Sequence, residues 1–297
     1  MHFERLIRFI DENGDRHFGE PLVSSPEELQ ERLNKGVLKA RALQGLEGGR
    51  WLNFEAARPK DPEELLSVKQ LIGPLDPEYI PIIRCIGLNY IKHIEEGGRK
   101  PPPYPSVFIK PSASTAGWND DIPIPTLAQN AQLDYEGELA IVIGKDAKDI
   151  TAENALEYIA GYTTANDISV RKWQRDPAFA GVVPQWCFSK GFDAFCPLGP
   201  MIVSPKLLGA ADNLPLKTLV NGEVRQDSNT SDLLFGVRKI VSFCSQGTTL
   251  QRGSIILTGT PSGVAMGMAI PKWLQHGDVV EVSIGGIGSI KNRIVFQ

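Results

Sequence analysis

The chain has 297 residues, of which 42% are hydrophobic, enough to bury a substantial core in one large domain or in a large domain with a small one. Lys and Arg number 31 and Asp and Glu number 35, so the formal charge is -4, and no dense run of either sign occurs. This balance argues against nucleic acid and acidic membrane surfaces as partners.

The first 75 residues are expected to form a small N-terminal α/β module. Residues 3–9 alternate as a strand does, residues 12–15 supply a hairpin turn, and residues 25–29 resemble a helix start with early acids. The opening residues contain acids and no long apolar region, which argues against a secretory or transit peptide. No stretch reaches the ~18 apolar residues of a membrane span, so a cytoplasmic location is expected.

The four cysteines are predicted to be buried thiols. They show no CxxC pairing and lie among apolar or aromatic neighbours, as in proteins of reducing compartments. They are Cys85, Cys187, Cys196 and Cys244.

Residues 76–297 are expected to form a second, larger domain. A Pro-rich passage at 71–81 leads into a strand-like run at 82–87, and helical patterns are fewer and shorter, notably at 152–159 and 233–245. Further strand signals occur at 106–110, 138–143, 216–220, 254–257 and 279–284. This order predicts an α+β fold with a mostly β core.

The segment 133–143 is the most informative for function. On a strand, a period of two places Asp134, Glu136 and Glu138 on one face, where like charges repel and call for a neutralising cation. A solvent-facing edge strand is the alternative interpretation. The apolar continuation at 140–143 favours a strand that enters a core, and Gly137 fits a close backbone approach.

Asp167 is the second candidate ligand. It lies where an apolar strand-like run gives way to a polar stretch, a usual place for a ligand at the end of a rigid element. The alternative role is a helix N-cap. Two glutamates and an aspartate without Cys or His spacing fit Mg²⁺ or Mn²⁺ and not zinc, and Ca²⁺ could take the same place in a crystal.

Six segments in this order resemble the fumarylacetoacetate hydrolase family, and the resemblance covers residues 82–297. They are 87–96, 108–112, 134–138, 166–169, 189–193 and 257–264. The resemblance implies a rolled, mixed β-sheet of the C-terminal type of that family, commonly dimeric. It also implies that Glu136, Glu138 and Asp167 hold the metal, which leaves Asp134 as a supporting or structural residue.

His93 and Glu96 are three residues apart, so on one helical turn the carboxylate can orient the imidazole and raise its basicity. In related enzymes such a pair lies on a lid and activates water for attack on a carbonyl carbon. An incidental surface pair is the alternative, and Glu95 competes with Glu96 for the role. The lid after Glu96, at 97–104, and the residues around Trp186 are expected to select the substrate.

The resemblance also assigns substrate contacts. Lys190, among aromatic neighbours, would meet the enolate or carboxylate oxygens, although it could instead be a surface lysine. Thr260, after Gly259, would offer its hydroxyl and backbone N–H to a carboxylate, unless the segment is a plain Gly-Pro turn. Gln174 would add a further donor.

With these residues, the resemblance implies a metal-dependent hydrolase that cleaves a C–C bond in a 2,4-diketo acid, of the acylpyruvate or fumarylpyruvate type, through a metal-stabilised enolate. The same chemistry supports an oxaloacetate decarboxylase or keto-enol tautomerase, which is the alternative. A binder of small carboxylates without turnover is a further alternative. The expected partners are a small 2-oxo acid and a second copy of the chain.

Overall fold

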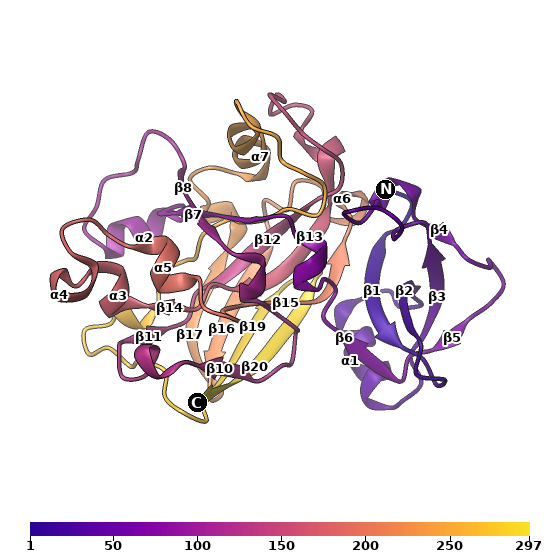
Figure 1. Cartoon of the computed structure of the whole chain (residues 1–297), viewed down its shortest axis with the longest axis horizontal. Coiled ribbons are helices and arrows are strands. Elements are labelled where there is room, and N and C mark those ends of the chain that lie inside the picture. Colours follow the sequence, from indigo (N-terminus) through magenta and orange to yellow (C-terminus); the bar gives the residue numbers. More distant parts are fainter.

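The computed structural model describes residues 1–297 and is mostly β, as predicted (Figure 1). Two sheets form the body, and a third sheet has two short strands. The short helices α2 to α5 gather at one end of the main sheet, and the N-terminal strands lie at the other end. No helix combines the length and the apolar character needed to cross a bilayer.

The N-terminal residues form the predicted hairpin and helix. The helix starts where expected, because the Ser25 side chain caps it by accepting a hydrogen bond from the N–H of Glu28 at 3.2 Å. The elements are β1 (Arg5–Ile10), β2 (Arg16–Pro21), α1 (Pro26–Asn34), β3 (Lys39–Gln44), β4 (Arg58–Pro59), β5 (Leu66–Ser67) and β6 (Gln70–Ile72).

The main sheet runs without a break from these strands into the rest of the chain. Strand β1 pairs antiparallel with β15, where Arg5 lies opposite Val203. The sheet order is β4-β3-β2-β1-β15-β13-β12-β18-β7-β8. The further strands are β7 (Ile83–Gly87), β8 (Ser106–Lys110), β9 (Thr115–Ala116), β12 (Gly137–Ile143), β13 (Ile159–Asn166), β15 (Cys196–Val203) and β18 (Ile255–Leu257). The division of the chain near residue 75 stays a prediction.

The second sheet packs against β12. Its order is β10-β20-β19-β16-β17, and the close approach predicted at Gly137 is made to Thr218 on β16, where an added Cβ would lie 2.3 Å from the hydroxyl oxygen. Its strands are β10 (Ile122–Ile124), β16 (Pro215–Val220), β17 (Glu223–Asn229), β19 (Val279–Ile284) and β20 (Gly288–Phe296). The third sheet pairs β11 (Leu133–Asp134) with β14 (Ser169–Val170).

The α-helices beyond α1 are short, and one helix prediction was wrong. Residues 152–159 form only a 3₁₀ turn, Ala155–Tyr158, because Ile159 already pairs with Ile143 in the main sheet. The helix expected from residue 233 begins later, since Leu234 and Phe235 donate their N–H groups to Asn89. The helices are α2 (Ile91–Glu96), α3 (Arg171–Arg175), α4 (Pro177–Ala180), α5 (Trp186–Lys190), α6 (Pro205–Leu208) and α7 (Val237–Ser245).

The cysteine prediction holds for three of the four residues. Cys85, Cys196 and Cys244 are buried free thiols, but Cys187 is exposed. Helix α5 is a little over one turn long and buries Ser189 and Lys190, so Cys187 falls on its outer face.

Candidate active site

Three carboxylates meet at one end of the β12–β13 pair. Glu138 lies on β12, while Glu136 and Asp167 lie just outside the two strands. The N–H of Asp167 donates to the carbonyl of Glu136 at 2.8 Å, and the N–H of Glu136 donates to the Asn166 side chain at 2.9 Å. Carboxylate oxygens of Glu136, Glu138 and Asp167 lie within 4.8 Å of one another, and all three residues are buried.

Asp134 does not belong to this group, so the prediction of three acids on one continuous strip was wrong. The strand breaks between Asp134 and Gly137, and Asp134 pairs instead within the small third sheet. Its carboxylate accepts from Arg171 Nε at 2.9 Å and from the backbone N–H groups of Ala265 and Met266 at 2.8 and 3.1 Å. Asp134 therefore holds Arg171 and the segment after Gly263 in place.

Buried cations neutralise two of the three grouped acids. Lys190 Nζ lies 2.8 Å from Glu136 Oε2 and 2.7 Å from Asp167 Oδ2, and Lys110 Nζ lies 2.6 Å from Asp167 Oδ1. Arg171 Nη2 lies 2.5 Å from Glu136 Oε1. Burial raises the pKa of Glu136, but Lys190 and Arg171 outweigh burial and lower that pKa to about 2. Burial lowers the pKa of Lys190, but Asp167 and Glu136 raise it to about 12.

Glu138 is the acid without a cation. Its carboxylate accepts one hydrogen bond, from the N–H of Gly259 at 2.6 Å. Burial, followed by the charges of Asp167 and Glu136, raises its pKa well above the usual range. Four buried carboxylates, with Asp134, thus face three buried cations. One more positive charge beside Glu138 would complete the balance, and a set of carboxylate oxygens suits a hard divalent cation.

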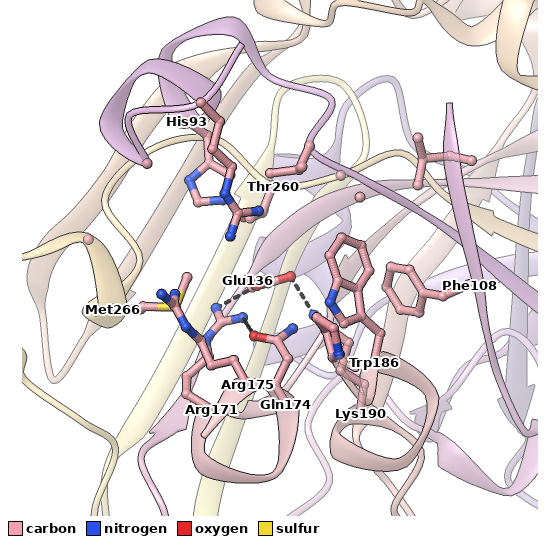
Figure 2. A pocket seen from close by; sticks show the side chains of 18 of the residues that line it. His93, Phe108, Glu136, Arg171, Gln174, Arg175, Trp186, Lys190, Thr260 and Met266 are labelled. Carbon is pink, nitrogen blue, oxygen red and sulfur yellow. Dashed lines mark hydrogen bonds and ion pairs between the residues drawn. The ribbon is translucent and has the colours of Figure 1, made fainter. Parts of the chain in front are cut away.

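The predicted histidine pair is present on α2. His93 Nδ1 lies 3.0 Å from Glu96 Oε2, while Glu96 Oε1 accepts the N–H of Gly263 at 3.1 Å. Glu95 is exposed, and the carboxylate hydrogen-bonded to His93 is that of Glu96. When Nδ1–H donates to the carboxylate, Nε2 is left as the acceptor. Figure 2 shows His93 above Glu136, with Thr260 beside His93 in the view.

One cavity of about 340 Å³ joins these groups. It is lined by His93, Glu96, Glu136, Glu138, Gln174, Lys190, Gly259 and Thr260, and by Phe108 and Trp186, whose rings lie edge to face at 5.2 Å. Asp167 lies below the lining, fully buried behind Lys190. The structure thus brings all nine sequence-predicted site residues together, although their roles stay predictions.

The structure changes the expectation for two of the polar groups. The Thr260 hydroxyl donates to the carbonyl of Gly137 at 3.0 Å and accepts from Gln226 Nε2 at 2.8 Å, so its hydrogen is already used. Its backbone N–H is the donor that remains. Gln174 Oε1 accepts from Arg171 at 3.1 Å, which leaves its amide nitrogen as a donor toward the cavity.

The sequence patterns did not identify several residues of the site. Lys110, Arg171 and Gln226 are buried and hold the acids and Thr260 in position. Lys110 lies within a segment that resembles the family, 108–112, but nothing in the local pattern shows its partner. Arg171 directly follows the short, buried strand β14, and a charged residue at the end of a strand was the only signal for it.

The wall of the cavity depends on Gly87. A Cβ at this position would lie 2.0 Å from Trp186 Cζ3 and 2.5 Å from Cη2. We expect Gly87→Ala to displace the indole ring and to lower the free energy of unfolding by about 1–3 kcal/mol, the usual cost of overpacking. Urea unfolding checks this, with Gly49→Ala as the control, because a Cβ there would have its nearest neighbours at 3.4 and 3.5 Å, which is ordinary contact. Equal stability of the two variants would show that the ring gives way without strain.

Comparison with known proteins places this site in a group of enzymes. Residues 82–295 match the family described as Fumarylacetoacetate (FAA) hydrolase C-terminal. The chain is 39% identical over 297 residues to a caffeoylpyruvate hydrolase from Neonothopanus nambi, covering 98% of this chain and 93% of that protein. It is 40% identical over 211 residues to a mitochondrial oxaloacetate tautomerase from Rattus norvegicus, covering 71% of this chain and 65% of that protein, slightly less than two thirds.

A solved structure supports the same grouping. The 2-hydroxyhepta-2,4-diene-1,7-dioate isomerase from Mycobacterium marinum superimposes with a TM-score of 0.78 at 32% identity, over 99% of each chain. The similar proteins therefore include a hydrolase, a tautomerase and an isomerase.

Proposed function

This chain belongs to the fumarylacetoacetate hydrolase family, and we propose that it hydrolyses a C–C bond in a 2,4-dioxo acid of the acylpyruvate type. The observation that carries the proposal is the cavity in which the His93–Glu96 pair faces the buried acids Glu136 and Glu138. Hydrolysis needs a general base that activates water, whereas loss of carbon dioxide does not. The similarity to a caffeoylpyruvate hydrolase over nearly the whole chain supports the same choice.

The proposed cofactor is Mg²⁺ or Mn²⁺, held by Glu136, Glu138 and Asp167. The donor set consists of carboxylate oxygens, and the unpaired Glu138 marks where positive charge is missing. When bound, such a cation supplies Lewis-acid polarisation of the substrate's 2-oxo and carboxylate oxygens. Lys190 and Arg171 keep Glu136 ionised, so that this ligand is ready without loss of a proton.

The residues of the chain have separate tasks in this mechanism. His93 Nε2 takes a proton from the attacking water, and Glu96 fixes the ring and stabilises the imidazolium that forms. Lys190 places positive charge beside the oxygen on which negative charge develops. The backbone N–H of Thr260 and the amide of Gln174 bind the substrate carboxylate. Water adds to the 4-oxo carbon, the bond between C3 and C4 breaks, and the pyruvate enolate takes the proton that His93 holds, which gives pyruvate and the acid.

The second candidate is keto-enol tautomerisation of oxaloacetate, with decarboxylation as a related outcome. It is favoured by the similarity to an oxaloacetate tautomerase over 211 residues. Hydrolysis and tautomerisation would use the same acids and the same lysine, because each reaction passes through an enolate. Binding of small carboxylates without turnover is the third candidate, and proton exchange at C3 of pyruvate would distinguish it from the enzymes.

A substrate screen tests the proposal directly. Purified protein is assayed with acetylpyruvate, fumarylpyruvate and oxaloacetate, each with Mg²⁺ and with EDTA. We expect Mg²⁺-dependent cleavage of at least one acylpyruvate into pyruvate and the matching acid. Turnover of oxaloacetate alone would replace the hydrolase proposal by the tautomerase or decarboxylase.

We also infer a homodimer, on the strength of the family resemblance, while the cytoplasmic location stays a prediction from the sequence. Sedimentation is expected to give roughly twice the chain mass of 32.5 kDa. A monomer at micromolar concentration would contradict the dimer.

A further inference from the structure

Two arginines on the wall of the cavity have no carboxylate partner. Arg99 follows the lid helix α2, and Arg175 is the last residue of α3. The only side-chain hydrogen bond of Arg175 goes to Met266 Sδ at 2.8 Å, and a thioether is a weak acceptor. The Arg99 side chain makes none, since only its backbone N–H is engaged, with Ile94 O at 3.0 Å.

The remaining cations of the cavity are already neutralised. Arg171 bridges Asp134 and Glu136, and Lys190 bridges Glu136 and Asp167. The outer carboxylate, Glu96, is engaged by His93 and by a backbone N–H. The charge left without a partner at the outer part of the cavity is therefore positive, although the chain as a whole carries a net charge of -4.

The two sides of the cavity differ in character. Figure 2 shows Arg175 and Met266 on the side away from Trp186 and Phe108, with Glu136 between the two sides. A ligand bound beside Glu136 thus has a flat apolar wall on one side and a guanidinium group on the other. The apolar wall suits a planar carbon chain, and the guanidinium suits an anion.

We propose that Arg99 and Arg175 bind a second carboxylate at the far end of the substrate, so that the preferred substrates are dicarboxylic 2-oxo acids. The inference rests on the proposed function and narrows its substrate class. A planar guanidinium can bind a carboxylate through two parallel hydrogen bonds, and two such groups from different elements fix its position. Since Arg99 lies just beyond Glu96, the same contact would tie the lid to α3 with His93 over the reacting end.

Binding of two matched ligands tests the subsite without turnover. 2-Oxoadipate and 2-oxohexanoate differ at the far end, where one has a carboxylate and the other a methyl group. With Mg²⁺ present, calorimetry is expected to show binding of 2-oxoadipate about 10- to 100-fold tighter, the range for hydrogen bonds to a charged group. Arg175→Met and Arg99→Met should each remove most of this preference and leave the affinity for 2-oxohexanoate within about threefold.

Arg16→Met is the matched control, because Arg16 is an exposed arginine on β2. It should keep the full preference, and melting curves of all variants establish that they are folded. Equal binding of the two ligands by the parent protein would overturn the subsite. A preference that survives in both arginine variants would overturn its assignment to Arg99 and Arg175.

Kinetics separate failure of this inference from failure of the proposed function. Fumarylpyruvate should be cleaved with a higher kcat/KM than acetylpyruvate or caffeoylpyruvate, and the arginine variants should lose the difference mainly through KM. Cleavage of acetylpyruvate and caffeoylpyruvate, which lack a second carboxylate, as fast as fumarylpyruvate, with no ligand preference, would leave the function standing and the subsite wrong. A 2-oxoadipate preference without cleavage of any acylpyruvate would leave the subsite standing and the proposed function wrong. If neither 2-oxo acid binds and no acylpyruvate is cleaved, both proposals are wrong.

Discussion

Glu138→Gln is expected to remove most of the metal-dependent activity while leaving the metal-free protein at least as stable as the parent. Glu138 is buried beside Glu136 and Asp167 without a cation, so removing its charge relieves repulsion in the metal-free state. The amide oxygen can still accept the N–H of Gly259. Loss of one metal ligand should cost several kcal/mol of transition-state stabilisation, roughly 10³-fold in kcat/KM. Thermal melting with and without Mg²⁺, together with steady-state rates, checks both parts.

Glu136→Gln is the matched comparison, and its stability should change in the opposite direction. Glu136 forms ion pairs with Lys190 and Arg171, so loss of its charge leaves each of these two buried cations with one carboxylate partner fewer. Breaking a buried pair from one side typically costs about 3–5 kcal/mol. A Glu138→Gln protein that still gains thermal stability from Mg²⁺ to the parent's extent would remove Glu138 from the metal site. Equal destabilisation of the two variants would show that Glu138 has a cation partner.

The strands were predictable wherever local patterns carry the information. The predicted runs at 106–110, 216–220 and 279–284 coincide within a residue with β8, β16 and β19, because alternation and β-branched content are read within a few residues. The pairing of β1 with β15 joins residues nearly two hundred positions apart, for which no local signal exists. The same limit explains residue 159, where pairing with Ile143 ended the expected helix early.

In the site, the acids were predictable and their partners were not. Glu136, Glu138 and Asp167 follow from spacing and resemblance, whereas Lys110 meets Asp167 from 57 positions away and Gln226 meets Gly137 from 89. Such contacts depend on which strands are neighbours. Asp134 was placed on the wrong strip for a related reason: two residues of irregular backbone undo the period of two on which the prediction rested.

His93→Ala is expected to lower acylpyruvate cleavage by about 10²- to 10⁴-fold, the usual cost of removing a general base. The imidazole is held by Glu96 and contacts none of the three grouped acids, so their geometry should survive. The variant should therefore still bind Mg²⁺ and oxalate, an enolate mimic, almost as the parent does. Stopped-flow assays give the rates, and calorimetry with oxalate gives the affinity. His2→Ala, at an exposed position far from the cavity lining, is the control.

The same variant separates the reactions that the family resemblance leaves open. Decarboxylation of oxaloacetate requires no attacking water, so it should fall far less than hydrolysis when His93 is removed, and tautomerisation, which still moves a proton, should fall to an intermediate extent. Glu96→Gln should lose nearly as much as His93→Ala, because one amide oxygen cannot accept both the N–H of Gly263 and Nδ1–H of His93, and an amide nitrogen facing Nδ1 favours the tautomer with Nε2 protonated. Cleavage at the parent's rate in His93→Ala would leave His93 as a residue of the lid only. Loss of oxalate binding would instead make it part of the substrate clamp, because the metal and its three acids would then be insufficient to hold the ligand.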